Sequence, residues 1–391
     1  MSNQNSTLNQ AISSASPFLK GLAIIGIILH HYYRGLYGIT QNVQWIYSQN
    51  FLETFLKSFF SGLSEAFIAS FYYLGYMGVS IFFVLSGWGL AMSALKRGPE
   101  KFALSGYFKS RAQKIFPLFL ASLFFFGLLF YGQGGKGLAD ELLGSLAKLL
   151  LLTNYSPSAI FTINPSYWFL GTIAILYILF PIIFLATLKS PKITLLTTIS
   201  IAYLATIAIQ LSPLQQWHPF FAMGGFPLAK IGEFSLGVFA AIIINEQKTD
   251  SASFFKDYKY TVIAILLLLL GLYSFSNPFA YPLHPILMVI PIIFFSIKTF
   301  RFANFWPKLL KPITYAGLYS YSAFLLHRPF VDAWVNINDQ NSAPIFYGLL
   351  FLLASVVLPS LFEITCNKTT TPLLSSGIGK AFDHFSHKNH F

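Results

Sequence analysis

The sequence is dominated by apolar stretches that approach the ~20 residues a helix needs to cross the hydrocarbon core of a bilayer. Only 10% of the residues are charged and 55% are hydrophobic, whereas soluble domains average about 25% charged residues. The pattern therefore predicts an all-α polytopic membrane protein with about ten transmembrane helices. The expected spans are about 17–38, 70–95, 115–132, 166–188, 192–211, 227–245, 259–276, 281–300, 314–334 and 344–364.

The expected domain organisation is a transmembrane domain over 17–365 between two polar tails, 1–16 and 366–391. The single cysteine, Cys366, excludes an intramolecular disulfide and any multi-cysteine metal site. The histidines of the second tail are better explained as part of a solvated segment than as metal ligands. We therefore expect no metal.

The net charge of +12 follows the expected topology. Most of the 25 lysines and arginines fall near the two ends or in the even-numbered connections, with a dense group between Lys96 and Lys114. Cytoplasmic loops carry an excess of these residues, so both termini are predicted to be cytoplasmic. The excess of basic residues is then explained by the membrane topology, and we expect no nucleic-acid partner.

The stretch KGLAIIGIILHHYYR, from Lys20 to Arg34, places ionisable groups inside the first span. Lys20 and His31 are eleven residues apart, about three helical turns, so they share one face at roughly 16 Å separation. His30 lies about 100° round the helix. An ionisable group at this depth is a functional hypothesis by default. The alternative is a histidine that bonds a neighbouring helix or reaches toward the headgroups.

Other polar residues in or beside the spans have both functional and structural interpretations. Arg111 and Lys114 share one helix face, where they suit phosphate binding or anchor an ordinary cytoplasmic helix end. Trp168 fits an interfacial aromatic belt. Glu233, three residues after Lys230, forms either a functional or a structural pair. His327 and Arg328 lie past the middle of their span, with Asp332 near its outer end.

Six motifs in this order resemble the acyltransferase-3 family of bacterial-type integral membrane O-acyltransferases, over about residues 17–364. They read KGLAIIGIILHHY, GVSIFFVLSGW, YFKSRAQKIFP, WFLGTIAILYILFP, KIGEFSLGV and YSYSAFLLHRP. The family's cation followed by a histidine maps onto Lys20 and His31. Its FFVLSG core maps onto Phe82 to Gly87, and its paired cations onto Arg111 and Lys114.

The chain departs from the family pattern in three ways. Lys20 and Lys114 stand where arginine is common, which keeps the charge and loses the bidentate fork. Ser80 stands where many members carry aspartate, and 173–174 read Ile-Ala where many carry Glu-Glu. The acidic partner of His31 is therefore open, with Glu233 and Asp332 as candidates.

The resemblance implies transfer of an acyl group, most simply acetyl from cytoplasmic acetyl-CoA, to a hydroxyl of a cell-surface or lipid-linked carbohydrate. His31 is expected to act as general base or to form a transient acyl-histidine. Lys20, Arg111 and Lys114 are expected to bind the donor's phosphates. Binding and supporting roles are expected for Arg34, Ser86, Trp168, Glu233, His327 and Arg328.

The resemblance also implies a multi-pass protein of the bacterial cytoplasmic membrane, with the lipid bilayer as its environment. The competing interpretation is a transporter or flippase for a glycan or a small anion, since interrupted helices and mid-membrane ionisable groups occur there too. Against it, the two halves of the chain show no duplicated pattern.

Overall fold

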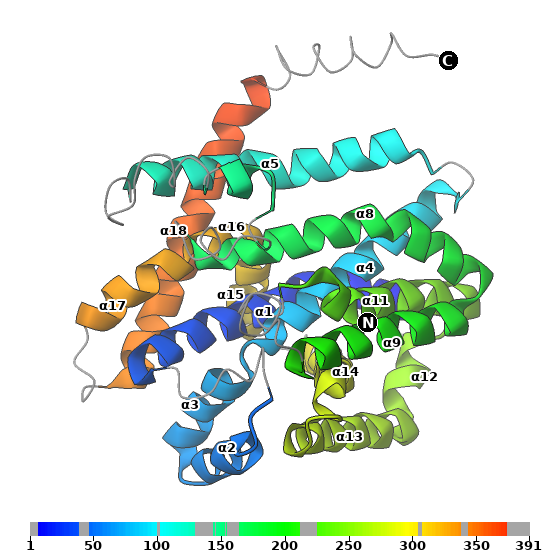
Figure 1. The fold of residues 1–391 in the computed structure, drawn as a ribbon, viewed down its shortest axis with the longest axis horizontal. Coiled ribbons are helices and arrows are strands. Elements are labelled where there is room, and N and C mark those ends of the chain that lie inside the picture. The colour runs from blue at the N-terminus through cyan, green and yellow to red at the C-terminus, as the bar shows by residue number, and fades with distance from the viewer. Residues whose placement is uncertain are drawn as a thin grey trace.

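The computed structural model describes residues 7–38, 47–99, 102–129, 144, 146–152, 154, 164–211, 225–303, 307–337 and 343–373. This part of the chain is helical, with no β-strand (Figure 1). The elements in chain order are α1 (Leu8–Tyr37), α2 (Phe51–Phe59), α3 (Leu63–Leu74), α4 (Met77–Arg97), α5 (Leu104–Leu129), the 3₁₀ helix η3 (Pro165–Tyr167), α8 (Trp168–Lys189), α9 (Pro191–Leu211), α11 (Pro227–Gln247), α12 (Ser251–Lys256), α13 (Tyr258–Tyr273), η4 (Ser274–Ser276), η5 (Tyr281–Leu283), α14 (His284–Ala303), α15 (Pro307–Leu318), α16 (Ser320–Leu326), η6 (Arg328–Phe330), α17 (Val331–Ile337) and α18 (Pro344–Leu373).

The predicted fold class is confirmed: nine helices of the described chain are long and apolar enough to cross a membrane. The continuous helix expected over 314–334 is wrong, because this run is divided among α15, α16, η6 and α17. Pro329 lies in η6, and a proline lacks the N–H that would continue a helix. The stretch of 70–95 is likewise divided, with the break at Gly75 and Tyr76.

Two of the helices extend into the expected tails. α1 begins at Leu8 because Thr7 and Gln10 form a capping box, in which each side chain bonds the other's backbone N–H. α18 continues to Leu373. The third span also starts earlier than expected, since α5 begins at Leu104 and places Arg111 and Lys114 within the helix.

Helix α1 runs through the middle of the bundle (Figure 1) and packs along α15, α4, α3 and α14. Its contacts are close because small residues meet backbone. A Cβ added at Gly317 would overlap the carbonyl oxygen of Pro17, and one at Gly21 would overlap that of Ile313. Small residues that let backbones approach are the usual basis of helix association in membranes. These contacts fix the depth and rotation of α1.

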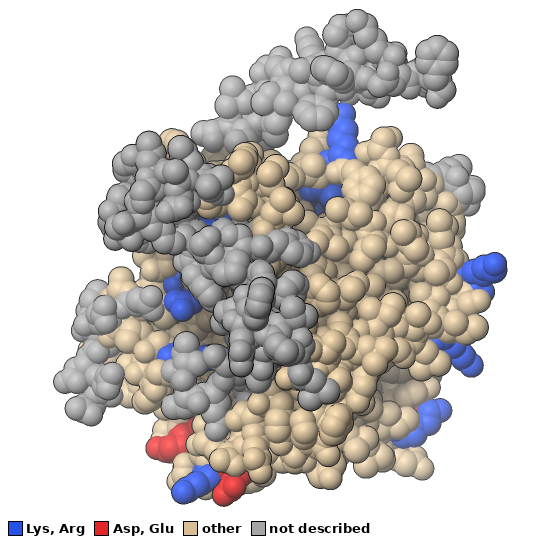
Figure 2. Space-filling view, viewed as in Figure 1, with Lys and Arg blue, Asp and Glu red and all other residues tan. Residues whose placement is uncertain are grey.

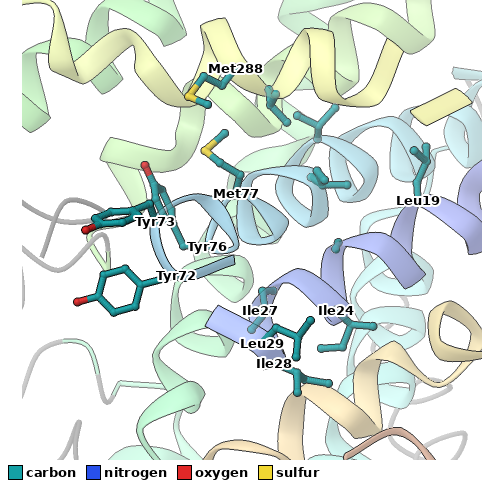
Figure 3. Close-up of a cluster of buried hydrophobic side chains, with 14 of the residues drawn as sticks. Leu19, Ile24, Ile27, Ile28, Leu29, Tyr72, Tyr73, Tyr76, Met77 and Met288 are labelled. Carbon is teal, nitrogen blue, oxygen red and sulfur yellow. The ribbon is translucent and has the colours of Figure 1, made fainter. Parts of the chain in front are cut away.

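The largest core cluster surrounds α1 at the α3–α4 junction. Figure 3 shows isoleucines and leucines of α1 near Tyr72, Tyr76 and Met77, with Met288 of α14 beside Met77. The opposite faces of the outer helices expose leucine and isoleucine, as on α13, where Leu266 and Leu269 are more than half exposed. Figure 2 shows a largely uncharged surface, as expected of a face in contact with lipid.

The α1–α15 contact predicts that Gly317→Ala lowers stability. The added methyl group must separate two backbones, and such overpacking costs about 1–3 kcal/mol. The thermal unfolding midpoint of the purified protein in detergent measures the effect. Gly89→Ala is the matched control, because a Cβ at Gly89 meets nothing within 4 Å. Equal midpoints for the two variants would contradict the proposed packing.

Candidate functional site

Two histidines from distant parts of the sequence meet between α1 and α16. The ring centroids of His31 and His327 are 5.3 Å apart, and the ring planes are inclined by 28°. The charges of Arg328 and Arg34 also act on His31. The structure therefore brings together four of the residues expected at the site, which we call the histidine cluster: His31, His327, Arg34 and Arg328.

The hydrogen bonds of the histidines separate their roles. His30 Nδ1 lies 2.9 Å from the carbonyl oxygen of Tyr72, and His327 Nδ1 lies 2.9 Å from that of Ala323. Because a carbonyl oxygen only accepts, Nδ1 of each neutral ring carries the proton. His31 makes no hydrogen bond to any described residue and keeps part of its surface accessible. Its ring nitrogens remain available for a substrate.

His30 anchors the register of α1. Its ring donates to the carbonyl oxygens of Phe71 and Tyr72, near the C-terminal end of α3. Gly26 and Gly75 bring the two backbones together at the same place. Since His31 is the next residue, this contact orients the face of α1 that carries His31.

A second group of expected residues, the cationic cluster, lies about 16 Å along α1 from His31, at the level of Lys20. The charge of Lys114 acts on Lys20, and the charge of Arg111 acts on Lys114. Arg111 donates to Ser110 Oγ at 3.0 Å. Among the described residues, none of the three cations forms an ion pair with a carboxylate. Such a group suits a polyanionic ligand.

Ser86 and Trp168 lie outside the histidine cluster. Ser86 forms a hydrogen bond with Tyr177, and the charge of Arg111 also acts on Tyr177. Ser86 therefore lies in the surroundings of Arg111. Trp168 starts α8 and packs edge-on against Phe169. Phe169 in turn contacts Phe324, whose ring lies 6.0 Å from that of His327. Trp168 is therefore connected to the histidine cluster through two intervening rings.

Glu233 is held in a polar group of its own. It is buried, and its Oε1 accepts from Ser80 Oγ at 2.6 Å and lies 3.4 Å from Lys230 Nζ. These contacts tie α11 to α4, so the structure places this candidate acid with Ser80 and Lys230 and gives it no contact with His31. The side chain of the other candidate, Asp332, lies outside the described residues.

Two buried polar residues near the Glu233 group, His284 and Tyr76, were not predicted from the sequence. His284 Nδ1 lies 2.7 Å from the carbonyl oxygen of Tyr281, and the Tyr76 hydroxyl lies 3.0 Å from His284 Nε2. With the proton on Nδ1, the tyrosine must donate. The sequence did contain a signal for this site, because His284 stands directly before a proline at the start of an apolar stretch. The pair joins α14 to the α3–α4 junction.

Comparison with known proteins gives one match. A family model described as an acyltransferase domain matches residues 17–364, nearly the whole chain. No curated protein and no solved structure matches. The matched region includes both clusters and the Ser80–Glu233 contact.

The buried Lys230–Glu233 pair predicts that removing the lysine alone destabilises the protein more than replacing both residues does. Lys230→Met leaves a buried carboxylate without its cation, which costs about 3 kcal/mol. Adding Glu233→Gln removes that charge and keeps an oxygen that accepts from Ser80, so the double variant is expected to recover most of the stability. Thermal unfolding midpoints of the wild type, both single variants and the double variant test this. Additive losses would show that the two side chains are not coupled.

Proposed function

This chain belongs to the acyltransferase domain family, and we propose that it moves an acyl group, most simply acetyl, from cytoplasmic acyl-CoA to a carbohydrate hydroxyl. The family and the nine apolar helices make it a multi-pass membrane acyltransferase. The proposed acceptor is a cell-surface or lipid-linked glycan, and the proposed location is the bacterial cytoplasmic membrane. Neither a metal nor a nucleic acid has a part in this proposal.

One observation carries the proposal: the cationic cluster and the histidine cluster lie on the same face of α1. Lys20 belongs to the first and His31 to the second, roughly 16 Å apart along the helix. A ligand that is anionic at one end and reactive at the other fits this arrangement. Coenzyme A thioesters have that form, with phosphates at one end and the thioester at the end of a long flexible arm.

The inner position of the cationic cluster supports a cytoplasmic donor. Lys20, Lys114 and Arg111 offer three positive charges that no described carboxylate neutralises. Phosphate oxygens accept charge-assisted hydrogen bonds from these side chains, which are stronger than bonds between neutral groups. The donor's arm then runs along α1 toward His31.

The chemistry of the histidine cluster suits acyl transfer. An imidazole such as that of His31, which bonds no described residue, can accept the proton of a hydroxyl or attack the thioester itself. The tetrahedral intermediate bears negative charge on the former carbonyl oxygen, and nearby positive groups stabilise it. Arg328 and Arg34, which act on His31, are placed for this role. His31 lies in the outer half of α1, which favours access of the acceptor from the outer face.

His31→Ala is expected to reduce acyl transfer by at least about 10²-fold, because the proton acceptor or nucleophile is lost. The assay measures labelled acetyl passing from acetyl-CoA to surface glycans in membranes with matched protein levels. His284→Asn is the control, since His284 is also buried, lies outside the histidine cluster and its replacement amide can still donate to the carbonyl oxygen of Tyr281. Near-normal transfer by folded His31→Ala protein would exclude His31 as the catalyst. A transporter would release no free thiol from acetyl-CoA.

Arg111→Ala is expected to raise the KM for acetyl-CoA by about tenfold, since one charge-assisted hydrogen bond contributes about 1.5–3 kcal/mol. Initial rates of thiol release over a range of acetyl-CoA concentrations give this value. Lys109→Ala removes the same charge from another face of α5 and is the matched control. If the two variants shift KM equally, the effect is one of general surface charge and the phosphate site is not at Arg111.

A further inference from the structure

We propose, on the basis of the proposed function, that the reaction is divided between two histidines. His31 carries the acyl group as a covalent intermediate, and His327 accepts the proton of the acceptor hydroxyl. The sequence left both roles open for His31 alone. Two neighbouring imidazoles allow each role to have its own side chain, so that His327 is a second catalytic residue.

The hydrogen bonds of His327 prepare it to accept a proton. Its Nδ1 donates to the carbonyl oxygens of Ala323 and Phe324, at 2.9 and 3.1 Å, so the neutral ring has its lone pair on Nε2. Nε2 is buried and makes no hydrogen bond to any described residue. The end of α16 supplies both carbonyl oxygens to Nδ1, and the Ala323 carbonyl also accepts the backbone N–H of His327. The buried lone pair of Nε2 has no partner among the described residues.

The placement of His31 suits the acyl carrier. It shares a helix face with Lys20 of the cationic cluster, so a thioester held by its phosphates approaches His31 along α1. Its ring remains partly accessible, whereas His327 is 1% exposed. His31 is therefore the ring that a thioester reaches, and His327, 5.3 Å away, lies beside it.

The first step transfers the acyl group to the enzyme. A nitrogen lone pair of His31 forms a bond with the thioester carbon, the carbon–sulfur bond breaks, and the thiolate leaves with the electron pair. The proton on the other nitrogen of His31 passes to the thiolate. The products are neutral acyl-His31 and coenzyme A thiol.

The second step transfers the acyl group to the acceptor. The hydroxyl oxygen attacks the acyl carbon while its proton passes to His327 Nε2. The carbon–nitrogen bond breaks, and the leaving nitrogen of His31 takes the proton from His327. Both histidines return to their neutral forms, so the two steps need no further reactant.

The experiment uses His327→Asn in the full-length protein. The asparagine amide can donate to the carbonyls of Ala323 and Phe324, as Nδ1 does, and lacks a basic nitrogen. Membranes are mixed with labelled acetyl-CoA and quenched rapidly, and protein-bound label, thiol and labelled surface glycan are followed. His284→Asn is the matched control, because His284 is also buried, lies outside the histidine cluster and makes the same kind of bond through Nδ1.

We expect His327→Asn to release thiol in a single burst, to accumulate protein-bound acetyl and to pass it to glycan at least about 10²-fold more slowly than wild type. His31→Asn should form no bound label, and His284→Asn should complete both steps. The proposal is overturned if His327→Asn passes its label at the wild-type rate, if it forms no label, or if His284→Asn stalls equally. Failure of the proposed function is distinct, since the wild type would then release no thiol.

Discussion

The close packing of α1 against the backbones of its neighbours is the constraint on which the rest of the structure depends. Helices in lipid gain little from burying apolar surface, so contact must come from van der Waals packing between small residues. Gly21 and Gly317 provide it on the α15 side, and Gly26 and Gly75 on the α3 side. These contacts hold α1 in the centre of the bundle and turn the face with Lys20 and His31 inward.

Charge is arranged by depth within this bundle. Cations gather at two levels along α1, whereas the buried carboxylate of Glu233 is paired with Lys230 and bonded to Ser80 in a separate group. An uncompensated charge in the membrane interior is costly, and among the described residues Lys20, Arg111 and Lys114 form no ion pair with a carboxylate. In the proposed reaction, the donor's phosphates bind the cationic cluster and the oxyanion forms beside the histidine cluster.

The sequence predicted most of the spans, the shared face of Lys20 and His31, and the proximity of Arg111 to Lys114. Each of these predictions depends on spacing within one helix, which is local. The prediction of a continuous helix over 314–334 was wrong, because Pro329 and the break at Tyr319 override the apolar pattern. The sequence also did not predict the contact of Tyr76 with His284, which joins residues 208 positions apart.

The sequence by itself determined a helical membrane protein, because the length and hydrophobicity of each stretch decide whether it can lie in a bilayer. It also determined which side chains share a face of α1, because helical geometry repeats every 3.6 residues. Only the tertiary structure decided that His327 stacks on His31 and that Glu233 bonds Ser80. Those choices depend on how separate helices rotate and pack, and no pattern within a single helix contains that information.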